Sequence, residues 1–222
     1  AGTYEIAVHD PLRGQRLAQA SITVKASESG TLDIVVKVDK KEMSMPNQYN
    51  SPPPMTIDTN KSYTATIHLE KGGEMVAELY PKESPTTVNS FVFLARKGFY
   101  DGVTFFRVIN LGPGLIAQTG DPTNTGTGGP GYEFDNETNV LRRHDRPGVL
   151  SMANAGIRGG RGTNGSQFFI AYAPMGFLDG HDTNGSPKNC SAPGTSCHTV
   201  FGLITQGFDV LTTISQRDPS TA

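Results

Sequence analysis

The sequence lacks several features that mark large functional classes. It has 222 residues with only two cysteines and no tryptophan, and no apolar run approaches the roughly 18 residues that a membrane-spanning helix needs. Lysine and arginine number 19 against 21 aspartates and glutamates, which gives a formal net charge of −2. No block of like charge occurs. We therefore expect neither a nucleic-acid partner nor an anionic membrane surface nor a membrane span.

Familiar catalytic and cofactor-binding motifs are also absent. The sequence has no Gly-x-x-x-x-Gly-Lys-[Ser/Thr] phosphate loop, no Gly-x-Ser-x-Gly nucleophile turn and no His-Glu-x-x-His metal motif. Five histidines and two cysteines leave little room for a multinuclear metal site. The glycine-rich run 125–131 lacks the following helix that phosphate binding requires, so we interpret it as a turn. We expect no cofactor and no metal.

Glycine and proline, by contrast, are plentiful. The 26 glycines and 15 prolines exceed average usage, which argues against a helical bundle and indicates turn-rich β structure. Three β-type runs, at 4–8, 20–25 and 32–38, predict a β-rich N-terminal segment over residues 1–40. A sheet this small cannot bury both of its faces by itself. We therefore expect it to pack on the rest of the chain or on an assembly partner.

The remaining sequence predicts a linker and one larger domain. Residues 41–62 are rich in proline, which predicts an extended linker. A single domain is expected over residues 63–222. A hairpin is expected at 63–69 and 75–80. Helices are expected at 85–97, with Ser84 as the N-cap, and at 208–215. Further short strands are expected at 104–109, 115–119, 149–153, 167–171 and 199–204. This pattern predicts a mainly β fold with a closed or nearly closed antiparallel barrel.

Several ordered motifs resemble the cyclophilin family of peptidyl-prolyl cis-trans isomerases. The most specific are Ser151-Met152-Ala153-Asn154-Ala155-Gly156 and Asn164-Gly165-Ser166-Gln167-Phe168-Phe169. The other matching runs are 105–109, 118–121, 126–129, 178–180 and 198–202. The resemblance covers about residues 63–218. It implies an eight-stranded antiparallel barrel capped by two helices, an active groove on its outer face, and Xaa-Pro polypeptides as substrates.

The resemblance also implies a set of site residues. Those that would act on the Xaa-Pro amide and the substrate backbone are Arg107, Gln118, Asn154 and Gln167. Those that would form the proline pocket and the peptide-binding segment are Leu115, Ile116, Ala153, Ala155, Phe169, Phe177, Leu178 and His198. The family commonly has Phe-Met at 115–116 and often Trp at 177, so the pocket is expected to differ in shape. Insertions at 110–112, 157–162 and 181–197 lie near the groove.

This residue set suits a reaction without covalent chemistry. Rotation about an Xaa-Pro bond breaks amide resonance, at a barrier of about 18–20 kcal/mol. In the twisted state the prolyl nitrogen becomes pyramidal and regains a lone pair. A guanidinium beside it then donates a hydrogen bond that the planar ground state accepts less well, so Arg107 would bind the transition state preferentially.

Several of these residues have structural alternatives. An isolated strand arginine such as Arg107 is more often an exposed charge, Phe169 could be a core residue, and His198 could be a buried structural histidine. The surrounding motifs favour the functional interpretation of all three. Asp179, Asp182 and Asn184 suggest either a calcium site or a polar turn, and we favour the turn.

The two cysteines lie in one inserted segment. Cys190 and Cys197 are best interpreted as a local disulfide, although a zinc site with His181 and His198 or two free thiols are alternatives. Disulfides persist mainly outside the cytosol, so we expect an extracytoplasmic, periplasmic or secreted protein.

The expected function is isomerisation of exposed Xaa-Pro bonds by an extracytoplasmic folding catalyst. The alternative is a Pro-peptide binding or assembly module, docked through residues 1–40. Arg107, Gln118 and Gln167 favour catalysis, because capture alone would need only the pocket.

The resemblance also implies one more strand after the second helix, yet no apolar run follows residue 218. We expect either a longer natural chain or a replacement strand from the N-terminal runs.

Overall fold

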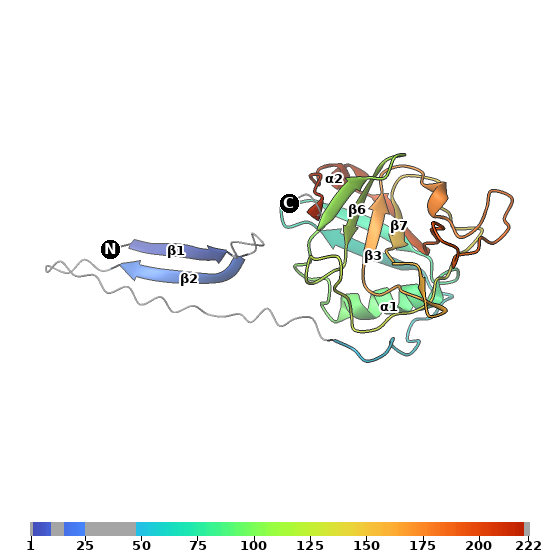
Figure 1. Ribbon diagram of the computed structural model, residues 1–222. Coiled ribbons are helices and arrows are strands. Elements are labelled where there is room, and N and C mark those ends of the chain that lie inside the picture. Colours follow the sequence, from blue (N-terminus) through green and yellow to red (C-terminus); the bar gives the residue numbers. More distant parts are fainter. Residues whose placement is uncertain (1, 10–15, 25–47, 220–222) are drawn as a thin grey trace, which may run out of the picture. The chain divides into compact units, whose positions relative to one another are not determined.

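The structure is a computed structural model that describes residues 2–9, 16–24 and 48–219 (Figure 1). The chain divides into two compact units, 1–45 and 46–222. In the first unit, strands β1 (Gly2–His9) and β2 (Arg16–Val24) pair antiparallel into a two-stranded sheet. They coincide with the runs predicted at 4–8 and 20–25. The run predicted at 32–38 lies outside the described residues.

The second unit is built on a seven-stranded antiparallel sheet, with neighbouring strands in the order β3-β4-β11-β7-β10-β6-β5. Its strands in chain order are β3 (Tyr63–His68), β4 (Glu74–Leu79), β5 (Arg107–Asn110), β6 (Leu115–Thr119), β7 (Val149–Met152), β10 (Phe168–Ala171) and β11 (Val200–Gln206). The predicted mainly β, antiparallel class is confirmed.

The helices and a small hairpin complete this unit. Helices α1 (Pro85–Arg96) and α2 (Phe208–Thr212) lie at opposite ends of the curled sheet (Figure 1). A 3-10 turn, η1, spans Gly176–Leu178. Strands β8 (Ile157–Arg158) and β9 (Arg161–Gly162) form a separate two-stranded hairpin. Among the described residues, neither helix has the length and apolar character that crossing a membrane requires.

Strand β10 is buried on both faces and separates two apolar clusters. Successive strand side chains point to opposite faces, so Phe168 and Ile170 join the main core while Phe169 and Ala171 join a second cluster. The main core also receives Phe91 of α1 and Leu211 of α2. The second cluster lies on the other face of the sheet, where the predicted site residues gather.

The first turn of α1 is capped from a distant part of the chain. Ser84 makes no side-chain cap and instead donates its hydroxyl to the Val200 carbonyl at 2.8 Å. The Glu137 carboxylate accepts the Thr86 and Thr87 backbone N–H groups at 2.9 and 2.8 Å. Ser84 is the N-cap residue as predicted, and its carbonyl accepts the Val88 N–H at 2.9 Å, but its side chain does not bind the first turn. Glu137 satisfies N–H groups that the helix itself leaves without partners.

The described part of the predicted linker lies against the second unit. The Tyr49 backbone N–H donates to the Pro130 carbonyl at 2.8 Å, and its ring packs edge-on against Phe93 at 5.0 Å. Ile57 is buried, and the Asn89 side chain binds the backbone around it. Residues 48–62 are thus held by tertiary contacts, and the boundary between the units falls at residues 45–46.

Among the described residues, no backbone ladder joins the edge strands β3 and β5, so the sheet is not closed into a barrel. After α2, Arg217 makes one antiparallel bridge with Val108 of β5, with N···O distances of 2.7 and 3.0 Å. This bridge lies where the expected additional strand would begin. Strands β1 and β2 pair with each other, and replacement of the additional strand by an N-terminal run stays a prediction.

Candidate active site

Strand register places the central site residues in one row across the sheet. Gln118 on β6 lies opposite Arg107 on β5 and, on its other side, opposite Phe169 on β10. Phe169 in turn lies opposite Ser151 on β7. Residues directly opposite one another in antiparallel strands share a face. The pairing alone therefore brings the arginine, the glutamine and the pocket aromatic together.

An apolar cluster, named here the pocket wall for the predicted pocket residues that it contains, lies next to this row. Phe169 is only 3% exposed, and the His198 ring packs edge-on against it at 5.6 Å. The buried members of this second cluster are Tyr80, Ile116, Val149, Phe169, Ala171, Met175, Leu178 and Val200, with Ala153 packed against them. Predicted pocket residues 116, 153, 169 and 178 therefore belong to one cluster, which His198 borders.

Three of the predicted residues lie differently. Leu115 is half-buried and belongs to neither cluster, and by strand alternation it points away from the face that carries Ile116. Phe177 is 46% exposed at the rim rather than part of the wall. Ala155 is exposed, and its backbone N–H is bound to the Thr163 hydroxyl at 2.8 Å. Their roles in substrate binding stay predictions.

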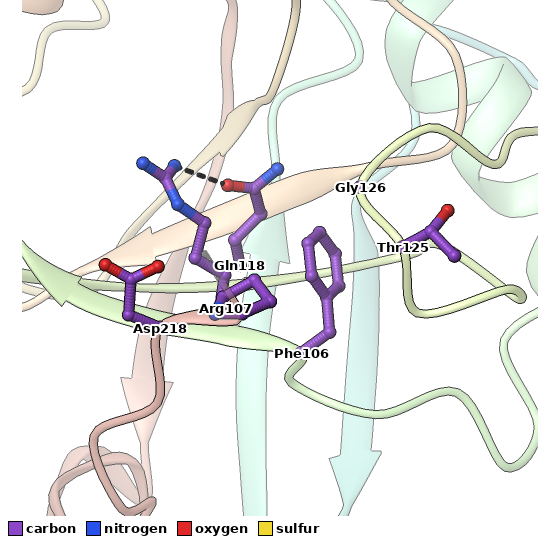
Figure 2. Close-up of a pocket in the computed structure, with 7 residues that line it drawn as sticks. Phe106, Arg107, Gln118, Thr125, Gly126 and Asp218 are labelled. Atoms are coloured by element: carbon purple, nitrogen blue, oxygen red, sulfur yellow. Dashed lines mark hydrogen bonds between the residues drawn. The ribbon is translucent and has the colours of Figure 1, made fainter. Parts of the chain in front are cut away.

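A chain of hydrogen bonds leads from a loop to the arginine. The Gln167 amide nitrogen donates to the carbonyls of Gly126 and Gly128 at 3.0 and 2.8 Å. The Gln118 amide nitrogen donates to Gln167 Oε1 at 2.9 Å. Arg107 Nη1 then donates to Gln118 Oε1 at 3.0 Å. Figure 2 shows this last bond, with the guanidinium and the amide pointing toward each other.

This chain determines which way both amides point. The two glycine carbonyls can only accept, so they require the nitrogen of the Gln167 amide on their side. Its oxygen therefore faces Gln118, which must present its own nitrogen. The Gln118 oxygen is left for Arg107. A guanidinium has donors and no acceptor, so each bond in the series has matched polarity.

A buried carboxylate holds the loop from which this chain begins. Asp121 accepts the backbone N–H groups of Thr123, Thr125, Gly126 and Gly128 at 2.6–3.1 Å. Burial alone would raise the pKa of Asp121, but hydrogen bonds from Thr123, Gly128 and Gly126 outweigh it and lower the pKa below its ordinary value. A Cβ on Gly128 would collide with this carboxylate, which explains the glycine there. The sequence interpretation of 125–131 as a turn did not include this anchor.

Asn154 leaves its backbone available. Its side-chain nitrogen donates to the carbonyl of Cys197 at 3.0 Å, and its side-chain oxygen accepts the Gly156 N–H at 3.0 Å. Its backbone N–H and C=O bind no other described residue, although the preceding Ala153 N–H donates to the Gln167 carbonyl. An extended segment with a free donor and acceptor can pair with an extended peptide.

His198 is held as a neutral ring. Its Nδ1 lies 2.9 Å from the Met152 carbonyl, which can only accept, so Nδ1 carries the proton. Burial lowers the pKa of His198 to about 4, and the Met152 hydrogen bond opposes that shift only in part. The pocket wall therefore carries no charge at neutral pH.

A polar network supports the pocket from behind, and the sequence did not predict it. The fully buried His144 stacks on Phe169 at 6.0 Å, with Nδ1 2.7 Å from Asp179 Oδ1 and Nε2 2.9 Å from the Ser151 hydroxyl. Asp179 Oδ2 accepts from Arg143 at 3.0 Å. Both oxygens of Asp179 are thus engaged by protein donors, which supports the turn interpretation over a calcium site.

The inserted segment carries the predicted disulfide. Cys190 and Cys197 are bonded, so the zinc and free-thiol alternatives are wrong. The Cys197 carbonyl accepts from both Asn154 and Asn136, at 3.0 and 3.2 Å. His198 follows directly in sequence and donates its backbone N–H to the Leu178 carbonyl at 2.9 Å. The disulfide therefore closes a loop that ends at the pocket wall.

A cavity of about 330 Å³ lies beside Arg107. It is lined by Phe106, Arg107, Gln118, Thr125, Gly126, Asp218 and Pro219 (Figure 2). Neither Phe169 nor His198 borders it. Phe106 is almost fully buried, as expected of a core residue. The proline pocket predicted at the Phe169 cluster is therefore distinct from this cavity and stays a prediction.

Comparison with known proteins identifies the second unit. A family profile described as "Cyclophilin type peptidyl-prolyl cis-trans isomerase/CLD" matches residues 64–222. The chain belongs to this family. Peptidyl-prolyl cis-trans isomerase B of Bacillus subtilis is 43% identical over 155 residues, which cover 70% of this chain and 92% of that protein.

Other relatives place the same domain in different contexts. The human peptidylprolyl isomerase domain and WD repeat-containing protein 1 is 43% identical over 157 residues, which cover 69% of this chain. The chain spans about a fifth of that relative, since the match covers 21% of it. A crystal structure of a cyclophilin type isomerase from Cryptosporidium parvum, in the presence of the dipeptide Ala-Pro, aligns with a TM-score of 0.53 at 32% identity. That alignment covers 67% of this chain and 82% of the other.

Asp121→Asn should lower catalytic efficiency, although Asp121 touches no substrate. The asparagine amide places its own N–H donors against the backbone N–H groups that the carboxylate accepts. The loop is then held less firmly, so the Gly126 and Gly128 carbonyls no longer keep their position against Gln167. We expect a loss of about 1–3 kcal/mol in the free energy of unfolding and a fall in kcat that exceeds any change in KM. Denaturant unfolding and a protease-free isomerisation assay measure these. The exposed control Asp101→Asn should change neither. A folded Asp121→Asn protein with unchanged kcat would contradict this positioning role.

The neutral His198 should make stability depend on pH between about 6.5 and 4. In this window the unfolded histidine binds a proton and the folded one does not, so stability falls as the pH is lowered. The contribution is about 2–3 kcal/mol by pH 4, at 1.36 kcal/mol per pKa unit. Urea unfolding across this range should show a shallower pH slope for His198→Gln. The exposed His68→Gln should keep the slope, and equal slopes for His198→Gln and the parent would contradict the assignment.

Proposed function

We propose that the protein isomerises exposed Xaa-Pro bonds of extracytoplasmic polypeptides and so acts as a folding catalyst. The observation that supports catalysis is the hydrogen-bonded series from Gln167 through Gln118 to Arg107, beside the wall formed by Phe169. A module that only captured proline segments would need the wall and the free backbone of Asn154. It would not need an arginine with two successive amides holding its position.

In this proposal the wall and the backbone hold the substrate while Arg107 acts on the amide. The proline ring packs against Phe169, Ile116 and Leu178, all buried in one cluster. Residues before the proline pair with the free N–H and C=O of Asn154, so one side of the peptide bond is fixed while the other rotates. The prolyl nitrogen regains a lone pair in the twisted state and accepts a hydrogen bond from the Arg107 guanidinium.

The environment strengthens this interaction relative to water. The guanidinium is half-buried, and Gln118 binds one of its nitrogens, which restricts its rotation. A donor that is already oriented does not need to reorganise as the amide twists. The neutral His198 and the apolar wall carry no negative charge that would compete with the prolyl nitrogen for the Arg107 guanidinium.

The extracytoplasmic location is proposed from the cysteines. The two cysteines of the sequence are joined to each other in a loop that carries the Cys197 carbonyl to Asn154. Such bonds persist where thiols are not kept reduced. The human relative joins an isomerase domain to WD repeats. By analogy, residues 1–40 are proposed as an attachment to an assembly partner.

Arg107→Ala should reduce kcat/KM for a short Xaa-Pro peptide at least tenfold, which corresponds to about 1.4 kcal/mol of transition-state stabilisation. Peptide affinity should change less, because the wall and the Asn154 backbone remain. NMR exchange spectroscopy gives both quantities without a coupled protease. The matched control is Arg96→Ala, an exposed arginine at the end of α1. Equal rates for Arg107→Ala and the parent would refute the role of Arg107.

Protein recovered from its natural compartment without reductant should contain no thiol that can be alkylated. Mass spectrometry should find the peptides with Cys190 and Cys197 linked. Cys190→Ser with Cys197→Ser should lower the free energy of unfolding by about 2–3 kcal/mol, as expected for closure of a short loop. Two free thiols in such a preparation would contradict the extracytoplasmic proposal while leaving the isomerase assignment untouched.

A further inference from the structure

The inserted β8–β9 hairpin projects from the peptide-binding segment on an anchored base. Arg158 and Arg161 lie opposite each other, and the turn between them consists of Gly159 and Gly160, both with positive φ. Below them, the Thr163 hydroxyl binds both Ala155 N–H and the Gly156 carbonyl, at 2.8 and 2.9 Å. The Gly162 N–H donates to Asp135 Oδ1 at 2.7 Å. The hairpin is therefore a defined projection rather than a loose loop.

The two arginines on it have no structural role in the described part of the molecule. Both are exposed, and neither makes a hydrogen bond or ion pair with any described residue. Like charges directly opposite each other on paired strands destabilise the pairing. The Asp135 carboxylate, which binds the Gly162 N–H, forms no ion pair with either guanidinium in the described part of the chain. A pair of small polar residues would serve the hairpin better, so folding does not explain this concentration of positive charge.

The hairpin follows Asn154 in the chain, the residue with which the proposed substrate pairs. The free backbone of Asn154 is followed by Ala155, Gly156 and then β8. A peptide that pairs antiparallel with Asn154 runs in the opposite direction, so its residues farther upstream lie against positions progressively later in this chain. At about 3.3 Å per residue, two to four residues upstream reach the hairpin. Ala155 is exposed and small, and leaves this path open.

We propose that Arg158 and Arg161 select Xaa-Pro segments that carry carboxylates two to four residues before the proline. The inference rests on the proposed isomerase function and adds a substrate preference to it. Because the two guanidiniums are exposed, the selection acts through screened charge attraction and should weaken as salt is added. The preference belongs to the inserted hairpin, separate from the wall and the Arg107 series that would act on every Xaa-Pro bond.

The test compares three peptides that differ only at the third residue before the proline, which is Glu, Gln or Lys. NMR exchange spectroscopy gives kcat/KM for each at low and at high ionic strength. For the parent protein we expect the Glu peptide to exceed the Lys peptide about three- to tenfold at low salt. The ratio should shrink toward one at 1 M salt. Arg158→Gln with Arg161→Gln should bring it close to one at low salt as well.

A variant with reversed charge provides a second test, which remains valid even if the substitutions change the conformation of the hairpin. Arg158→Glu with Arg161→Glu should favour the Lys peptide over the Glu peptide, a result that damage to the site cannot produce. The control Arg96→Gln removes an exposed arginine elsewhere and should keep the parent ratio. A parent ratio near one, or a ratio that survives both double substitutions, would overturn this proposal. Failure to isomerise even the Gln peptide would instead refute the proposed function.

Discussion

Strand β6 pairs with β5 on one side and with β10 on the other, and this double pairing determines which side chains can meet. It places Gln118 between Arg107 and Phe169 on a single face. A shift of register by one residue would move the glutamine to the core face and bring Ala117 outward. The burial of β10 on both faces opposes such a shift, because Phe168 and Phe169 are each fitted into a different apolar cluster.

Groups that can act only as donors or only as acceptors determine how the side-chain amides next to this row are oriented. The Asp121 carboxylate accepts backbone N–H groups, and this arrangement exposes the Gly126 and Gly128 carbonyls to Gln167. Each following amide then has one permitted orientation. The site is thereby organised before any substrate arrives, as electrostatic stabilisation of a twisted amide requires. Asp121 contributes by positioning, because it lies several bonds away from the reacting atoms.

Sequence patterns predicted the elements because these depend on local order, whereas the wall residues came from the resemblance to a family. The helical spacing in 85–97 records which side of the helix is buried, and the apolar run in 167–171 fits a strand that is buried on both faces. The structure agrees within a few residues. Tertiary hydrogen bonds leave no such local record. Glu137 caps a helix some 50 residues earlier in the chain, and His144, which Asp179 holds, stacks on Phe169. The packing of Tyr49 against Phe93 likewise depends on a distant partner.

A crystal structure with a bound Xaa-Pro peptide tests the account most directly. The account predicts the proline ring against Phe169, Ile116 and Leu178, the preceding residues paired with the Asn154 backbone, and the Arg107 guanidinium within hydrogen-bonding distance of the prolyl nitrogen. Both amides should keep their present orientation. A proline ring seated in the cavity beside Phe106 and Thr125, with the Asn154 backbone still free, would contradict it.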